Sequence, residues 1–283
     1  MTELCLVTGG AGFIGSHLVE ALAAAGRPVR VLDDFDPGQR SNLAGIRPAP
    51  EMQEGDVSDP AAVARAVAGA GVVFHLAALA SVQRSLDDPV RTQQVCDTGT
   101  LYVLDAARRA GVRRVVFASS NHAVGFYARH APIGVDVTVR PDSRYGVSKA
   151  FGEALGALYA DKYRLRVLCL RIGNVGERPL DKRRLSIWIK PEDLAQLCRI
   201  GLEHPDLRYE IFYGASFSER SWWDNSAAYA FGYRPTGRAE DYREEAMAAQ
   251  AKLPDDPIGD FYQGGSFCSA EFGGDSTRAW KPA

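Results

Sequence analysis

The stretch VTGGAGFIG, at positions 7–15, constrains the fold more than any other part of the chain. Its glycines, Gly9, Gly12 and Gly15, form a G-x-x-G-x-x-G pattern between an apolar run that predicts a strand, Leu4–Thr8, and a segment of helical period, Ile14–Ala25. Glycine at these positions permits a tight turn whose backbone approaches a pyrophosphate, and the first N–H groups of the helix then stabilise its charge. A glycine-rich turn that only serves helix packing would show the same pattern. The surrounding sequence has to distinguish such a turn from a pyrophosphate site.

The first two-thirds of the chain alternates short, β-rich apolar runs with longer alanine-rich segments of helical period. Further strands are expected at Val29–Leu32, Met52–Glu54, Gly71–Ala77, Val112–Ala118 and Arg166–Arg171, and further helices at Ala61–Ala68, Pro89–Ala110 and Tyr145–Tyr163. Beyond Gly173 the sequence predicts a helix at Pro191–Glu203, a strand at Tyr209–Tyr213, a short helix after Trp222 and an irregular tail from Leu253. The alternation predicts an α/β fold with a Rossmann-type doubly wound parallel sheet and a small C-terminal substrate-binding region.

Composition narrows the class of partner. With 283 residues, of which 46% are hydrophobic, the chain can bury a large core. Its formal net charge is −2 and it has no basic block, which argues against a nucleic acid or an anionic membrane as partner and favours a small molecule. The five cysteines form no C-x-x-C pair, no apolar run is long enough for a membrane span, and no His/Asp/Glu cluster suggests a metal. We therefore expect a cytoplasmic protein that needs no metal.

Acidic residues follow two of the expected strands. Asp33 and Asp34 end the second strand, about 20 residues beyond the glycines, where a carboxylate can accept both ribose hydroxyls of an adenosine and repels the 2′-phosphate of NADP. NAD is therefore the expected cofactor, and a solvated acidic turn is the alternative. In the later segment GDVSD, Asp56 could reach the adenine and Val57 could cover its face.

The segment RYGVSKAFGE places Tyr145 and Lys149 four residues apart, on one face of the expected helix. A phenol with a pKa near 10 is a poor base at neutral pH, but a neighbouring ammonium and an oxidised nicotinamide both favour the phenolate. Lys149 would also hold the nicotinamide ribose, while Tyr145 would take a proton from a substrate hydroxyl. Taken alone, the Y-x-x-x-K pattern would also fit an exposed helix that carries an aromatic residue and a cation without any catalytic role.

In order and spacing, TGGAGFIG, LDDF, GDVSD, HLAA, FASS and YGVSK resemble the extended short-chain dehydrogenase/reductase superfamily over roughly the first 175 residues. The resemblance implies that Ser120 is the third catalytic residue, whose hydroxyl shares the substrate oxygen with Tyr145, while Ser119 is structural or a neighbour of the cofactor. It also implies cofactor contacts from the glycine-turn residues Phe13 and Ile14 and from the HLAA residues Leu76, Ala77 and Ala78.

Two branches of the superfamily compete. The segments GGAGFIGSHLVEAL and SVQRSLDDP resemble nucleotide-sugar epimerases and dehydratases, whereas VVFASSNHAVGFY, RPDSRYGVSKAFGE, LRIGN, RRLSIW, WWDNS and FYQGGSF resemble uronate dehydrogenases. The second set covers the half that builds the substrate pocket, and the chain is short for a protein that must also hold a nucleotide. We therefore expect residues 1–173 to form an NAD-binding Rossmann domain, and 174–283 a substrate-capping region and tail interleaved with it in one compact unit.

The expected reaction is the NAD-dependent oxidation of a free hexuronic acid, glucuronate or galacturonate, at C1 to the aldarolactone, with Tyr145 as general base. Dehydrogenation of another aldose or a hexose phosphate, and nucleotide-sugar epimerisation or dehydration, are the alternatives. A non-catalytic NAD-sensing module is disfavoured, because the Tyr145 and Lys149 pair is retained. The resemblance also implies a homo-oligomer.

The resemblance further assigns substrate contacts. Asn121 and His122 would hydrogen-bond sugar hydroxyls, Ser81 the sugar or the cofactor, and Arg183 the C6 carboxylate through a bidentate fork. From the sequence alone, His122 would equally fit an ordinary loop residue. The basic run at 182–184 would fit a solvated loop, in which Arg184 rather than its neighbour could be the inward residue.

Two residues depart from the pattern of the relatives. Asn174 stands where uronate dehydrogenases have serine, and asparagine occurs there in relatives that oxidise other sugars or sugar phosphates. Cys96 stands where the superfamily has asparagine in an N-x-x-G-T pattern. A thiol cannot replace the paired donor and acceptor of an amide, so whatever that amide braces has to be held differently.

Overall fold

The computed structural model describes residues 3–79 and 82–274. Its core is a seven-stranded sheet of order β3-β2-β1-β4-β5-β6-β9, in which every neighbouring pair is parallel. The strands are β1 (Leu4–Thr8), β2 (Val29–Asp33), β3 (Glu51–Glu54), β4 (Ala70–His75), β5 (Arg114–Ser120), β6 (Arg166–Ile172) and β9 (Tyr209–Gly214). The strand order reverses direction between β1 and β4, as it does in a doubly wound Rossmann sheet, so the predicted fold class is confirmed.

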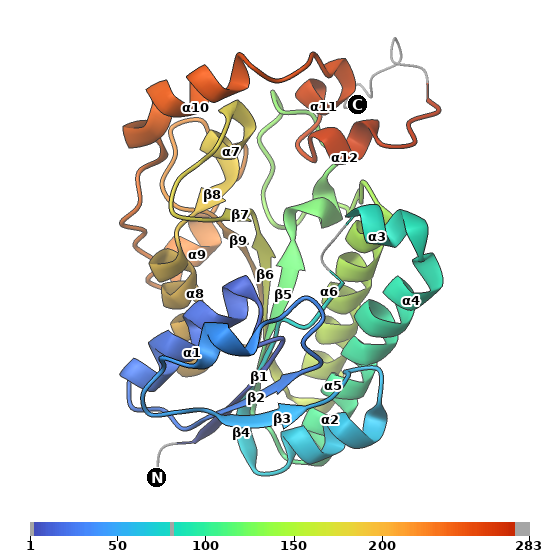
Figure 1. Cartoon of the computed structure of the whole chain (residues 1–283), viewed down its shortest axis with the longest axis vertical. Coiled ribbons are helices and arrows are strands. Elements are labelled where there is room, and N and C mark those ends of the chain that lie inside the picture. The colour runs from blue at the N-terminus through green and yellow to red at the C-terminus, as the bar shows by residue number, and fades with distance from the viewer. Residues whose placement is uncertain (1–2, 80–81, 275–283) are drawn as a thin grey trace.

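Helices cover both faces of this sheet (Figure 1). One face packs against α1 (Phe13–Ala24), α8 (Pro191–Glu203) and α9 (Ser226–Ala230), and the other against α2 (Pro60–Val67), α5 (Gly99–Arg109) and α6 (Arg144–Tyr163). Alternate residues of a strand serve the two layers: Val7 packs with Leu18 of α1, and its neighbour Leu6 lies in the cluster of Leu104 of α5. This burial on both sides explains why the strands are apolar without alternation.

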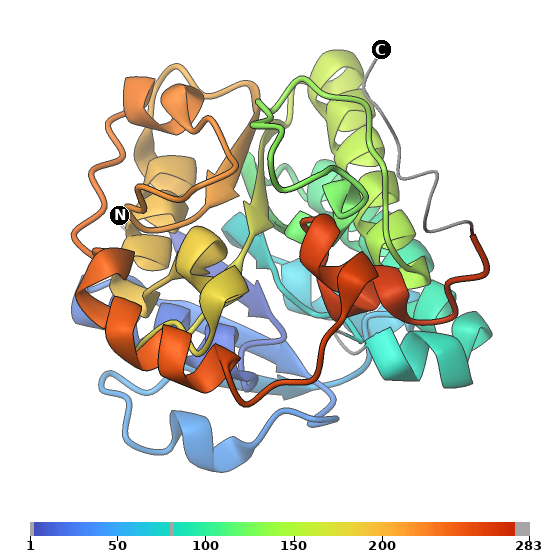
Figure 2. The ribbon, with the colours of Figure 1, turned by 90° about the horizontal axis from the view of Figure 1, so that it is seen from above.

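A cap covers the carboxyl ends of the strands, as Figure 2 shows from above. It contains a two-stranded parallel ribbon, β7 (Asn174–Val175) and β8 (Trp188–Ile189), with α7 (Lys182–Ile187), α10 (Arg243–Gln250), α11 (Pro257–Phe261) and α12 (Ser266–Ser269). Small separate clusters of buried aromatic and aliphatic side chains hold the cap together. Because β9 and α8 also come from the later part of the chain, the cap and the sheet share their elements.

The structure corrects three expectations about the elements. The expected helix Pro89–Ala110 is interrupted: α4 (Pro89–Gln93) runs into a π-helical turn, Gln94–Thr98, before α5 begins. A helix that the sequence did not predict, α3 (Val82–Asp87), precedes it. The tail beyond Leu253 is not irregular, because α11 and α12 form there. Asp256 caps α11 by accepting a hydrogen bond from Gly259 N (2.8 Å), with Pro257 at the first helical position.

Within the described ranges, no helix combines the length and the apolar character that a bilayer crossing requires. The same residues contain no group of three His, Cys, Asp or Glu side chains placed to hold a metal ion.

Candidate active site

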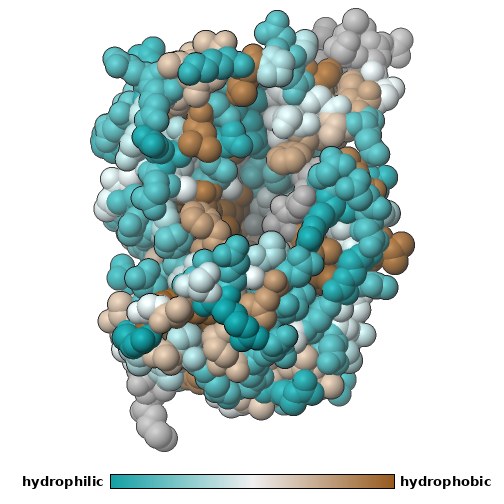
Figure 3. Space-filling view, in the orientation of Figure 1, coloured by the Kyte–Doolittle hydropathy of each residue, from teal (hydrophilic) through white to brown (hydrophobic). Residues whose placement is uncertain are grey.

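A cleft of about 390 Å³ opens at the carboxyl ends of the strands, beside the reversal of strand order between β1 and β4. Figure 3 shows the molecule hollowed between the sheet layer and the cap, with apolar side chains in the recess. Most of the predicted cofactor residues line this cleft: Gly9, Gly12, Phe13, Ile14, Gly15, Asp33, Asp34, Val57, Leu76, Ala77, Ala78 and Lys149. Ser120 and Tyr145 line it as well, and the sequence did not single out Leu79 and Val95, which complete its apolar wall.

The glycine turn has the backbone that an anion site requires. Gly9 has a φ of +71°, and a Cβ there would lie 2.7 Å from the backbone nitrogen of Ala77, so a side chain would be both strained and crowded. Gly12 directly precedes α1 and no side chain caps that helix end, whereas Asp59 caps α2 and Ser143 caps α6. The first N–H groups of α1 therefore remain available for a pyrophosphate.

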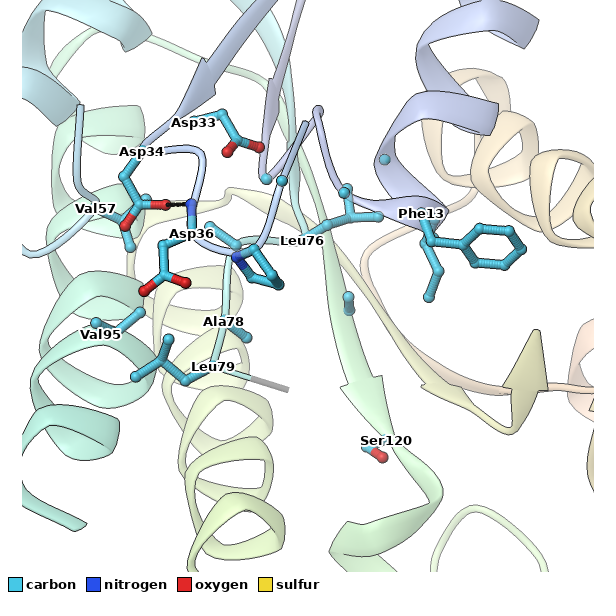
Figure 4. A pocket seen from close by; sticks show the side chains of 18 of the residues that line it. Phe13, Asp33, Asp34, Asp36, Val57, Leu76, Ala78, Leu79, Val95 and Ser120 are labelled. Atoms are coloured by element: carbon cyan, nitrogen blue, oxygen red, sulfur yellow. Dashed lines mark hydrogen bonds between the residues drawn. The ribbon is translucent and has the colours of Figure 1, made fainter. Parts of the chain in front are cut away.

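The two acidic residues at the end of β2 have different environments. Asp33 is buried, and its two carboxylate oxygens accept hydrogen bonds from Ala11 N and Phe35 N, both 2.8 Å long. Its carboxylate thus braces the glycine turn as well as facing the cleft. Asp34 accepts a hydrogen bond from Asp36 N (3.1 Å), and partial burial raises its pKa. Figure 4 shows Val57, Leu79 and Val95 on the side of Asp34, where an adenine would meet apolar surface.

Asp56 makes contacts that the sequence did not predict. Its carboxylate accepts a hydrogen bond from Ser58 N (2.7 Å) and forms an ion pair with Arg91. Gly55 and Val57 line the cleft on either side of it, but Asp56 is not among the lining residues. Asp56 therefore fixes the acidic loop after β3 against α4, and its contact with the adenine stays a prediction.

Ser120, Tyr145 and Lys149 come together at the other end of the cleft. Ser120 ends β5, and the other two lie in the first turns of α6, which begins after its cap Ser143. The Ser120 hydroxyl is hydrogen-bonded to the Tyr145 phenol, and Lys149 Nζ lies 5.3 Å from the centroid of the Tyr145 ring. Ser119 lines the cleft too, and its hydroxyl donates a 2.6 Å hydrogen bond to buried Glu153.

Burial governs the pKa values of this pair of titratable residues. It raises the pKa of Tyr145, which the hydrogen bond from Ser120 opposes, and it lowers the pKa of Lys149. The sequence predicted that the ammonium would favour the phenolate, but within the protein itself burial outweighs that effect.

The π-helical turn brings Cys96 and Asp97 to the same region. Cys96 is buried, and its carbonyl accepts a 2.5 Å hydrogen bond from Thr100 Oγ1, which in turn contacts His75 Nε2 (3.0 Å). Asp97 Oδ1 is buried with no hydrogen-bond partner among the described residues, and the Asp97 charge opposes the lowering of the Lys149 pKa. This turn lacks the asparagine amide that the superfamily has at the position of Cys96. It instead places the Asp97 carboxylate where its charge acts on the pKa of Lys149.

Asn121 and His122 follow Ser120 in a buried 3₁₀ turn, Asn121–Val124. His122 Nδ1 lies 2.6 Å from Asp142 Oδ2. With its amide oriented to suit both neighbours, Asn121 donates to Ile172 O (3.2 Å) and accepts from Arg183 Nη2 (3.0 Å). Two of the expected substrate residues therefore meet a third from the cap.

The inward residue of the basic run is Arg183. Its Nε donates a 2.8 Å hydrogen bond to Gln263 O, and burial lowers its pKa to about 10. Arg184 instead forms an ion pair with Asp181, the cap of α7, and Lys182 is exposed. Of the two arginines that the sequence left as alternatives, Arg183 is the one that contacts Asn121.

Several residues at this end were missed by sequence reasoning. Gln263 is buried and accepts a hydrogen bond from Trp223 Nε1 (3.0 Å), and the ring of Phe267 packs edge-on against that of His122 at 4.5 Å. Their segment, FYQGGSF, carried the resemblance but no assigned roles. Asn174 begins β7 opposite Trp188 and does not line the cleft. Ser81 lies outside the described residues.

Comparison with known proteins agrees with this geometry. Residues 5–205 match the NAD dependent epimerase/dehydratase family. The chain belongs to that family. A uronate dehydrogenase of Pseudomonas syringae pv. tomato is 36% identical over 273 residues, which cover 95% of this chain and 94% of that protein.

Solved structures are similar over most of the chain. A glucuronic acid dehydrogenase from Chromohalobacter salexigens has a TM-score of 0.84 at 34% identity, covering 95% of this chain and 97% of its own. A mutant uronate dehydrogenase from Agrobacterium tumefaciens complexed with NAD has a TM-score of 0.83 at 34% identity, covering 95% and 98%. The family is NAD-dependent, and the glycine turn and uncapped α1 of this chain fit a dinucleotide.

Proposed function

We propose that the protein oxidises a free hexuronic acid, glucuronate or galacturonate, at C1 to the aldarolactone, with NAD as the hydride acceptor. The observation that carries this proposal is the position of Arg183, held beside Asn121 next to the end of the cleft where Ser120 and Tyr145 lie. A guanidinium binds a carboxylate through two parallel N–H bonds, which a neutral sugar cannot match. The similarity to uronate and glucuronic acid dehydrogenases over 95% of the chain supports the same substrate class.

Tyr145, in its phenolate form, accepts the proton of the C1 hydroxyl. Ser120, hydrogen-bonded to that phenol, stabilises the charge that develops on the substrate oxygen. Lys149 holds the ribose of the nicotinamide and adds positive charge near the phenol. NAD, when bound, accepts the hydride from C1 and supplies the redox chemistry that side chains lack. One sugar and one NAD thus give the lactone, NADH and one proton.

A hexose phosphate is the second candidate substrate, because the run Lys182–Arg184 is basic and Asn174 is typical of such relatives. The charges of the run argue against it. Arg184 is paired with Asp181 and Lys182 is exposed, so Arg183, which is half-buried, is the member of the run that contacts Asn121.

A substrate panel tests the proposal directly. NADH formation is followed by absorbance with glucuronate, galacturonate, neutral hexoses and hexose phosphates, each with NAD and with NADP. We expect NADH with the two uronates, and preference for NAD because Asp33 and Asp34 face the cleft. The absence of net NADH with every free sugar would instead favour an epimerase or dehydratase that recycles its cofactor.

The role of Arg183 is tested by Arg183→Ala, with Arg184→Ala as the matched control. Loss of the guanidinium should raise KM for hexuronates on the order of 10- to 100-fold, and KM for neutral hexoses little, since only the carboxylate loses a charged partner. Arg184→Ala removes a charge of the same run that is already paired with Asp181, so both KM values should stay near wild type. An equal loss on charged and neutral sugars in the Arg183→Ala variant would place Arg183 outside the carboxylate site.

A further inference from the structure

Asp142, the buried partner of the expected sugar contact His122, has no role in the chemistry described so far. His122 Nδ1 and Asp142 Oδ2 lie 2.6 Å apart, and the Asp142 side chain is 0% exposed. Asp142 directly precedes Ser143, the cap of α6, so it stands one turn before Tyr145 in the chain. A carboxylate at this depth occupies space that an apolar side chain would fill at lower cost, unless the charge itself is used.

The hydrogen bonds around Asp142 decide which nitrogen of His122 carries the proton. Ser143 Oγ accepts from Gly146 N (3.1 Å), which leaves its own hydrogen free to point at Asp142 Oδ1, 2.9 Å away. Both oxygens of Asp142 are then acceptors, so Nδ1 of His122 has to be the donor in the 2.6 Å bond. Among the described residues, none is hydrogen-bonded to the other ring nitrogen, Nε2.

The imidazole is also fixed in place by packing. The ring of Phe267 meets it edge-on with centroids 4.5 Å apart, and the ring of Tyr145 lies 6.1 Å from it. Gly264 leaves room for the carboxylate on the far side, since a Cβ there would overlap Asp142 Oδ2. Ring, carboxylate and backbone therefore define one orientation of Nε2.

The other polar groups at this end of the site are mostly donors. Arg183 has only N–H groups, and Asn121 Oδ1 already accepts one of them (3.0 Å). Tyr145, as phenolate, is committed to the C1 hydroxyl in the proposed reaction. A second sugar hydroxyl that is buried here still needs an acceptor for its own hydrogen. A buried donor without an acceptor would weaken binding.

We propose that Asp142 is a positioning residue that holds His122 in the Nδ1–H form, so that Nε2 accepts a hydrogen bond from a sugar hydroxyl next to Tyr145. The proposal rests on the proposed function only in taking a sugar as the ligand. The state of the imidazole itself can be measured without any substrate.

The test uses Asp142→Asn, a change of charge at nearly constant size. Because Ser143 donates to Oδ1, the amide keeps its oxygen there and turns its NH₂ toward Nδ1, which moves the ring proton to Nε2. The ¹⁵N chemical shifts of the imidazole should then show a proton on Nδ1 in the wild-type protein and on Nε2 in the variant. His122→Ala identifies the signal among the five histidines. A wild-type proton on Nε2 alone would overturn the proposal, whatever the substrate.

Kinetics separate positioning from a structural role through a double-mutant cycle. In the wild-type background Asp142→Asn should raise KM for the oxidised sugar roughly tenfold, with kcat changed less than about threefold, because the lost contact is also present in the ground state. In the His122→Ala background the same substitution should change KM less than about twofold. An effect that persists undiminished without His122 would mean that Asp142 acts through α6 instead, and would overturn the proposal.

Discussion

Tyr145 and Lys149 share a buried site that disfavours the charged form of both. Burial raises the pKa of the phenol and lowers that of the ammonium, and the hydrogen bond from Ser120 only partly offsets the first effect. The protein alone therefore keeps Tyr145 largely protonated at neutral pH. The positive charge of an oxidised nicotinamide beside Lys149 would favour the phenolate. Tyr145 would therefore act as a base when the oxidised cofactor is bound.

This electrostatic setting predicts the pH dependence of the reaction. Since the pKa of Tyr145 lies above its ordinary value of about 10, the phenolate fraction rises about tenfold for each pH unit below that pKa, and kcat/KM should climb with it between about pH 6 and 9. The climb should end as Lys149, with its lowered pKa, loses its proton. Tyr145→Phe should lower kcat by about 10²- to 10⁴-fold at every pH. A pH-independent kcat/KM in the wild-type protein would contradict the assignment of Tyr145 as the base.

At the scale of elements, the C-terminal segment with α11 and α12 closes the substrate end of the site. Gly264 N donates to Gly125 O (2.9 Å), the Gln263 carbonyl accepts from Arg183, and Phe267 packs on His122. Arg129 also holds this segment in place, because its Nε donates a hydrogen bond to Tyr262 O (3.0 Å). The segment thus positions substrate residues without touching the cofactor cleft.

Gly264→Ala should loosen this segment selectively. The added Cβ would overlap Asp142 Oδ2 and lie 2.7 Å from Cys268 Sγ, so the segment has to move away from Arg183 and His122. We expect KM for the sugar to rise roughly tenfold, with the Kd for NAD unchanged in calorimetry. Gly273→Ala is the matched control, because a Cβ there meets nothing within 4 Å. Equal weakening of NAD binding by Gly264→Ala would mean that the segment supports the whole molecule rather than one end of the site.

The elements that the sequence predicted are those with a local signal. The strand β1 has its predicted bounds, Leu4–Thr8, and α6 begins one residue before the expected Tyr145, because Ser143 is a strong helix cap. The π-helical turn at Gln94–Thr98 was missed because its residues continue a helical pattern. The helices α11 and α12 were missed because five- and four-residue helices depend on partners far away in the chain, such as Arg129.

Within the site, too, local sequence signals could be predicted and contacts between distant parts of the chain could not. The resemblance to the superfamily implied that Ser120 belongs with Tyr145 and Lys149, and all three line one cleft, since a strand end and the next helix meet at one edge of a parallel sheet. Asp142 meets His122 across 20 residues, and Arg183 meets Gln263 across 80 residues, in loops whose paths no local pattern predicts. Only the folded chain could reveal these pairs.

At the scale of the whole molecule, a buried ion pair joins the sheet, a helix and the cap. Arg171 of β6 binds Glu153 of α6 through Nε and Nη2, both 2.9 Å from a carboxylate oxygen, and its Nη1 donates to Val135 O (3.1 Å). Glu153 also accepts from Ser119, next to Ser120, and its carbonyl accepts from Tyr209 of β9 (2.9 Å). The side chains of the pair are 2% and 5% exposed, so neither charge can be hydrated if the other is lost.

Glu153→Gln should therefore destabilise the entire fold. Removing one partner of a buried pair leaves an uncompensated charge, here the Arg171 guanidinium, at a cost of about 3–5 kcal/mol in the free energy of unfolding. Urea denaturation followed by circular dichroism measures this loss. Glu245→Gln is the matched control, because its partner Arg178 forms an exposed pair that should contribute little. If both variants unfold at the same urea concentration as the wild type, the network does not unite the three parts of the molecule.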